Sequence, residues 1–137
     1  MSTRCQVEIY DGANTEPGAM LYHHSDGYPD FMVGKLTRFL NAAFQWLKEA
    51  GYPYWWDSER VAAVLIALSI EDYEQPLKPY STDRLDKFAG PDSDEPYRVN
   101  NGIPVFQPCL NHHGDIQYLY HVRLLAGGTF TIEGTKN

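Results

Sequence analysis

The spacing of apolar residues changes twice along this chain, and that change constrains the fold more than any other feature. Val7 and Ile9 alternate with polar residues, which is the period of a half-buried strand. Between residues 36 and 47 the apolar residues recur three or four positions apart, as on one face of a helix. Residues 116–125, rich in Tyr and β-branched side chains, return to strand character. Strands, then helices, then strands again predict an α+β domain.

The first half of the chain is expected to form two strands and two helices. Residues 5–10 and 19–23 predict a strand hairpin. Asp30 is expected to cap the first helix, and Gly51 to end it. Asp57 or Ser58 should cap a second helix whose body, residues 61–68, is apolar almost all round. That composition is typical of a central, buried helix, with Val64, Leu65 and Leu68 in the core.

Three strands are expected in the second half. Residues 103–110 predict a strand that Pro104 and Pro108 confine to a sheet edge. Residues 116–125 and 129–133 predict a hairpin closed by Gly127-Gly128, with the last four residues frayed. The prediction is therefore one domain over residues 1–137: an antiparallel sheet of about five strands with two helices on one face, in the order β-β-α-α-loop-β-β-β.

An acidic, proline-containing segment at residues 71–101 interrupts these elements. From residue 71 to residue 96 it holds eight acids and three bases, which is −5 of the net charge of −7. A connection this long without regular structure is typical of a functional loop. We interpret it as a surface for a basic protein partner, with Asp83, Asp86 and the nearby Trp56 among the binding residues.

Charge and composition limit the class of protein. A net charge of −7 and a pI of about 5.1 argue against direct nucleic-acid binding, which needs a basic surface. No phosphate-binding loop or nucleophile elbow occurs, so no cofactor is expected. Cys5 and Cys109 lie in no C-x-x-C pattern and are expected to be reduced. The first ten residues hold no apolar run and the longest apolar run is too short to span a bilayer, so a cytoplasmic protein without membrane contact is expected.

The same short pattern, two histidines, a small residue and an aspartate, occurs at residues 23–26 and 112–115. Each copy adjoins a predicted strand end, so we expect the two turns to lie together at one end of the sheet. If they converge, His24, Asp26, His113 and Asp115 could bind a divalent metal. Aspartates and histidines are also ordinary turn residues, and a structural or partner-contact role is the competing interpretation.

Two longer motifs contain these turns. Residues 22–29 read Y-H-H-S-D-G-Y-P, and residues 113–120 read H-G-D-I-Q-Y-L-Y. They resemble small phage and bacterial proteins of unassigned function that carry Y-x-H-x-D-G-Y-P and a late H-G-D-I-x-Y-x-Y, with Trp or His at the position of Ser25. The resemblance implies an accessory protein of a phage or mobile element. By position it also implies the binding residues Tyr22, His24, Asp26, Tyr28, His113, Asp115 and Tyr118.

These observations favour a small, acidic, non-enzymatic protein that binds a partner, for example an inhibitor of a host-defence system in a bacterial cytosol. One alternative is a metal-dependent hydrolase built on the two histidine turns. Another is a binder of a small nucleotide-like ligand, with Arg123 and tyrosines as the walls of its pocket.

The acidic segment can be tested directly. Reversing the charges of Asp83, Asp86, Asp92 and Asp94 together should slow association with a basic partner, because clustered acids steer a partner of opposite charge. The association rate at low salt, measured by surface plasmon resonance, checks this. A variant that associates as fast as the parent would show that this segment is not the interface.

Overall fold

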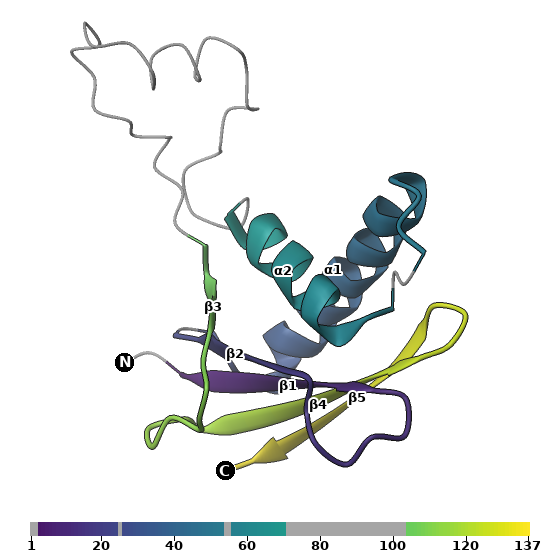
Figure 1. Ribbon diagram of the computed structural model, residues 1–137. Helices are drawn as coiled ribbons and strands as arrows, with labels where there is room; N and C mark the ends of the chain where they lie inside the picture. The colour runs from purple at the N-terminus through teal and green to yellow at the C-terminus, as the bar shows by residue number, and fades with distance from the viewer. Residues whose placement is uncertain (1–2, 25, 54–55, 71–103) are drawn as a thin grey trace, which may run out of the picture.

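The computed structural model describes residues 3–24, 26–53, 56–70 and 104–137, and it shows the predicted α+β fold. Figure 1 shows the helices packed on one side of a single sheet. The described elements are β1 (Cys5–Asp11), β2 (Ala19–His23), α1 (Pro29–Glu49), α2 (Ser58–Ser69), β3 (Phe106–Pro108), β4 (Tyr118–Leu125) and β5 (Thr129–Lys136).

The sheet is mixed, which corrects one part of the prediction. Its strand order is β3-β2-β1-β4-β5. Three neighbouring pairs are antiparallel, but β1 and β4 are parallel, and they form the centre of the sheet. Parallel neighbours require a long crossover between them, and the helical region supplies it. The edge position predicted for the proline-flanked strand β3 is confirmed.

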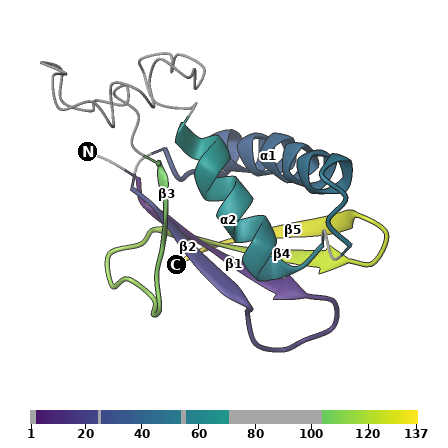
Figure 2. The same cartoon turned by 45° about the horizontal axis from the view of Figure 1, so that its top comes forward.

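The core lies between the helices and one face of the sheet. Figure 2 shows α1 and α2 crossing above that face. Helix α2 packs on β1, β2 and β3, whereas α1 reaches β5. Val7 and Ile9 of β1 are fully buried there, against helix residues such as Leu36, Leu40 and Leu65. Alternation along β1 therefore turns Gln6, Glu8 and Tyr10 toward the opposite face.

A proline and a glycine determine where α1 begins and ends. The helix begins at Pro29 and not after Asp30, because proline fits the first helical position, where no amide donor is needed. Gly51 ends it, as predicted, with φ at +76°. The Gly51 amide donates to the Lys48 carbonyl, and the Tyr52 amide donates to the Leu47 carbonyl. These two bonds are the pattern of a Schellman cap.

Helix α2 is tied to the sheet through its first turn. Asp57 is its N-cap and accepts the Glu59 amide. Asp11, at the end of β1, accepts both the Ser58 amide at 2.8 Å and the Ser58 hydroxyl at 2.6 Å. A Cβ on Gly18 would lie 2.0 Å from that hydroxyl oxygen, so the approach of the β1–β2 loop requires glycine there.

Three further expectations are settled by burial and pairing. Leu65 is fully buried and Val64 nearly so, but Leu68 is half-buried and Ala67 is exposed, so α2 is less enclosed than its composition predicted. Strand β5 pairs with β4 as far as Lys136, so the predicted fraying after residue 133 is wrong. Both cysteines are free thiols, and burial raises the pKa of Cys5 to about 12.

Neither described helix combines the length and the apolar character needed to cross a bilayer. The predicted acidic segment, with Asp83 and Asp86, lies outside the described residues.

Replacing Leu65 with Ala should lower the free energy of unfolding by about 2–5 kcal/mol, because the side chain is fully enclosed by the core. Urea denaturation followed by circular dichroism measures this. Ala67→Ser, on the exposed side of the same helix, is the matched control and should cost about 0.5 kcal/mol. An unchanged midpoint for Leu65→Ala would mean that α2 does not support the core.

Candidate functional site

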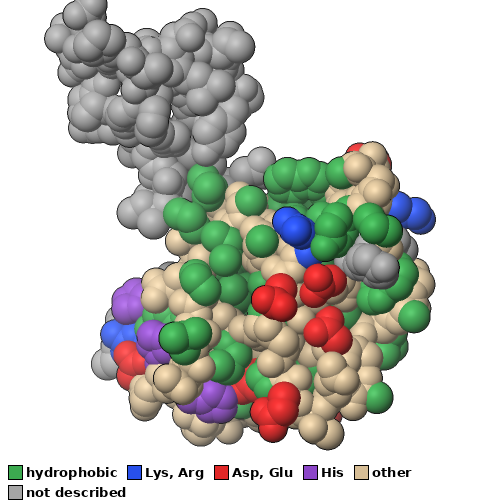
Figure 3. All heavy atoms as spheres, in the orientation of Figure 1, with side chains coloured by type: hydrophobic (Ala, Val, Ile, Leu, Met, Phe, Trp, Pro, Cys, Tyr) green, Lys and Arg blue, Asp and Glu red, His purple; other side chains and the backbone are tan. Residues whose placement is uncertain are grey.

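Four of the five histidines lie on the face of the sheet opposite the helices. His24, His112, His113 and His121 contact side chains of that face, which we call the histidine face. His23 points instead into the core beside Phe106, as alternation along β2 requires. In Figure 3 histidine side chains gather at the lower left of the view, and a separate group of acids lies nearer its centre.

Glu8 is the centre of the histidine face. It is 4% exposed, although it carries a carboxylate. The Tyr10 hydroxyl donates to one carboxylate oxygen at 2.8 Å, and His112 Nε2 lies 2.5 Å from the other. His121 Nε2 lies 4.0 Å from Glu8 Oε2, the oxygen that accepts the Tyr10 hydroxyl. Because a buried carboxylate needs hydrogen-bond donors, Glu8 holds the β3–β4 loop, residues 109–117, against the sheet.

Tyr10 and Arg123 extend this network toward the β1–β2 loop. Burial, and then the bond to Glu8, raise the pKa of Tyr10 to about 12. The Arg123 guanidinium lies over the Tyr10 ring at 4.8 Å. Its Nη1 donates to the backbone carbonyls of Gly12 and Asn14 at 2.6 and 2.9 Å. Arg123 therefore fixes a loop, and its place in a nucleotide pocket is not supported by these contacts.

The two histidine turns lie together, as their matching patterns predicted. The rings of Tyr22 and His113 are stacked with centroids 4.0 Å apart. The Tyr22 hydroxyl lies 3.1 Å from His24 Nδ1. The His113 amide donates to the Gln6 side chain, which anchors the second turn beside the first.

The meeting of the turns does not assemble the metal site considered from the sequence. Arg4 Nε lies 3.5 Å from His24 Nδ1 and 3.3 Å from Asp115 Oδ2, so a guanidinium occupies the space between two of the expected ligands. Asp26 is exposed, with φ at +54°. Among residues 3–24, 26–53, 56–70 and 104–137, no three His, Cys, Asp or Glu side chains are placed to hold a metal ion.

Tyr28 and Tyr118 are brought together in a separate hollow. Tyr28 is 39% exposed and Tyr118 is half-buried, and both line one cavity of about 420 Å³. This cavity, which we call the tyrosine pocket, is lined by Thr3, Tyr28, Ile116, Gln117, Tyr118, Lys136 and Asn137.

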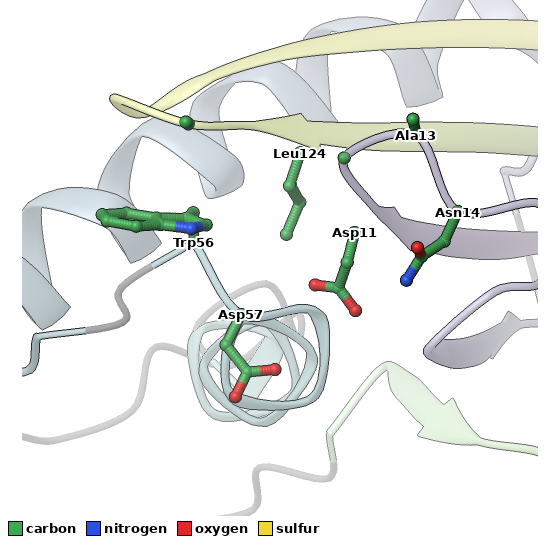
Figure 4. A pocket seen from close by; sticks show the side chains of 8 residues that line it. Asp11, Ala13, Asn14, Trp56, Asp57 and Leu124 are labelled. Atoms are coloured by element: carbon green, nitrogen blue, oxygen red, sulfur yellow. The ribbon is translucent and has the colours of Figure 1, made fainter.

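Trp56 lines another cavity, of about 490 Å³, beside the first turn of α2. Figure 4 shows its indole on one side and the Asp11 carboxylate across from it, with the Asp57 side chain pointing away from the indole. Both Asp11 and Asp57 are among the residues that line the cavity. Leu124 and Asn14 complete the walls. We call this hollow the acidic pocket. It places an aromatic ring and two carboxylates around one opening.

A lysine is also buried in the described part of the chain. Lys35 is 2% exposed, and its Nζ lies 2.9 Å from His23 Nε2. The same nitrogen lies 5.4 to 5.7 Å from the ring centroids of Phe31, Phe39 and Phe106. These aromatic faces stabilise an ammonium group that water does not reach.

Sequence reasoning missed several residues that organise these sites. Glu8, Arg4 and His121 are among them, because a polar residue on an alternating strand is ordinarily read as facing water. The sequence predicts Asp57 only as a helix cap, and it assigns no binding role to Asp11. Asp83 and Asp86, which were predicted to bind a partner, lie outside the described residues.

Comparisons with known proteins add no assignment. No protein-family model, curated protein or solved structure matches this chain. The functional argument therefore depends on the described geometry and on the chemistry of the side chains.

Replacing Tyr10 with Phe should lower the free energy of unfolding at pH 8 by about 1.5–3 kcal/mol, the usual contribution of a hydrogen bond to a charged group. The substitution should also change how the free energy of unfolding falls at alkaline pH. Because the folded-state pKa of Tyr10 is raised to about 12 from about 10, its stabilisation is complete below pH 10 and lost as the pH rises to 12. Urea titrations between pH 8 and 12 should show a shallower decline for Tyr10→Phe. An identical decline would contradict the assignment.

Proposed function

We propose that this chain is a small, acidic, non-enzymatic protein that binds a basic protein partner. The observation that carries the proposal is the acidic pocket, which joins the Trp56 indole to the carboxylates of Asp11 and Asp57. An arginine or lysine side chain of a partner has the chemistry to occupy it. A guanidinium or ammonium group gains from an aromatic face and from carboxylate oxygens at once.

The size and stiffness of the acidic pocket support this assignment. Its volume of about 490 Å³ far exceeds the roughly 30 Å³ that one water takes up, so it has room for a side chain. Asp11 is fixed by two bonds from Ser58, and Asp57 by the Glu59 amide. Carboxylates already held in place lose little conformational entropy when a partner binds.

The acidic pocket lies beside the first turn of α2. Both carboxylates lie at the N-terminus of α2, where the helix dipole favours negative groups. The net charge of −7 attracts a basic partner over a longer range and speeds encounter at low salt. The charge of the whole chain and the chemistry of the pocket therefore favour the same kind of partner.

The biological setting belongs to the same proposal. We propose an accessory protein of a phage or mobile element that acts in a bacterial cytosol, for example by blocking a host-defence protein. The two motifs at residues 22–29 and 113–120 and the small acidic domain support this setting.

The proposal is tested with a short arginine-rich peptide as the probe, by isothermal titration calorimetry at low salt. Asp57→Asn removes one charge but keeps an N-cap side chain, and Trp56→Phe keeps a ring that packs on the core. Asp57→Asn should weaken binding about tenfold or more, since one charge-assisted contact contributes about 1.5–3 kcal/mol. Trp56→Phe should weaken it by a smaller factor, because a phenyl ring attracts a cation less strongly than an indole does.

Glu49→Gln is the matched control, because it removes an equal charge from a residue that does not line the acidic pocket. It should weaken binding only slightly, through the loss of long-range attraction. Equal affinity of all three variants for the peptide would show that the acidic pocket is not a site for basic side chains. The same conclusion follows if a peptide of the same length without lysine or arginine binds as tightly as the arginine-rich peptide.

A further inference from the structure

The two sequence motifs meet at the beginning of β1, and no residue of either motif lines the acidic pocket. Cys5 pairs with His23 of β2 on one side and with Tyr118 of β4 on the other. The turn after β2 and the segment before β4 therefore lie next to each other, although about ninety residues separate them in sequence.

Part of each motif builds the structure of this junction. The Gly27 amide donates to the Thr3 carbonyl, and the Tyr120 hydroxyl donates to the Gly27 carbonyl at 2.7 Å. A Cβ on Gly27 would lie 2.7 Å from the Cβ of Cys5, so only glycine fits. Pro29 begins α1. These motif residues are explained by packing and need no ligand.

The other side of the junction is equally well fixed. The Arg4 amide donates to Gln117 Oε1, and the Gln117 amide donates back to the Arg4 carbonyl. Asn137 donates to the carbonyls of Gln117 and Ile116 at 2.8 and 3.0 Å. A cavity with such a rim keeps its shape before a ligand arrives.

Four motif residues line the tyrosine pocket: Tyr28, Ile116, Gln117 and Tyr118. The two tyrosines bring aromatic rings and hydroxyls to this lining, and Lys136 brings an ammonium group. The N-terminus of α1, immediately after Tyr28, adds positive partial charge, which Asp30 in its first turn partly offsets.

We propose that the tyrosine pocket binds a small ligand that joins a planar ring to an anionic group, the chemistry of a nucleoside monophosphate. A base can stack on a tyrosine ring, and a phosphate can pair with the Lys136 ammonium. The amides of Gln117 and Asn137 lie in the same lining and can read the edge of a base. Arg123 takes no part, because it is bound to the β1–β2 loop.

The test is calorimetric titration of the full chain with AMP, GMP, CMP and UMP, with the matching nucleosides and with inorganic phosphate. At least one monophosphate should bind, and its nucleoside and phosphate alone should each bind at least tenfold more weakly. Tyr28→Ala should weaken binding about 5- to 100-fold, as loss of one stacking platform does. Lys136→Gln should weaken binding of the monophosphate but leave binding of the nucleoside unchanged.

Lys48→Gln, an equal charge change on α1, is the control for Lys136→Gln and should leave binding unchanged. Because Tyr28→Ala could disturb the start of α1, amide chemical shifts of residues 116–118 provide a second measurement in the unmodified chain. Those shifts should move on titration with the monophosphate that binds. The proposal is overturned if no monophosphate binds, or if Lys136→Gln and Lys48→Gln bind it equally.

This site is independent of the acidic pocket. Trp56→Phe and Asp57→Asn should leave monophosphate binding unchanged, and Lys136→Gln should leave binding of the arginine-rich peptide unweakened. Failure of either proposal is therefore recognised without reference to the other.

Discussion

The position of β1 at the centre of the sheet is the constraint on which the rest of the structure depends. Strands β2 and β4 flank it, the helices cover one face, and the β3–β4 loop covers the other. Every residue from Cys5 to Tyr10 is buried as a result. Glu8 must then be satisfied by protein groups, and Tyr10 and His112 supply the bonds. The loop and its histidines are placed where this carboxylate requires them.

The parallel pairing of β1 with β4 decides where the two motifs lie. Since β2 runs antiparallel to β1, it ends beside Cys5; since β4 runs parallel, it begins beside Cys5. Had β4 run antiparallel, as the sequence suggested, the start of β4 would lie at the far end of β1. The histidine turns and the tyrosine pocket thus arise from a parallel pairing, which the predicted antiparallel sheet did not include.

The surfaces around this core differ in how far their polar groups are already engaged. On the histidine face, Glu8, Arg4 and Arg123 bind groups of the protein itself, which stabilises loops. In the acidic pocket, Asp11 and Asp57 accept hydrogen bonds from the first turn of α2 and also line an open cavity. One pair of residues thus attaches a helix to the sheet and creates a negative surface, so structure and recognition are coupled at the start of α2.

The sequence by itself determined the elements: the hairpin of β1 and β2, both helices, the stop at Gly51 and the edge position of β3. Each follows from apolar spacing or from backbone limits of Gly and Pro, which act over a few residues. Only the tertiary structure decided the parallel central pair, the burial of Glu8, the place of Arg4 between His24 and Asp115, and the joining of Tyr28 with Lys136. These bring together residues more than a hundred positions apart. They are set by the cost of burying polar groups across the whole domain, which no local pattern records.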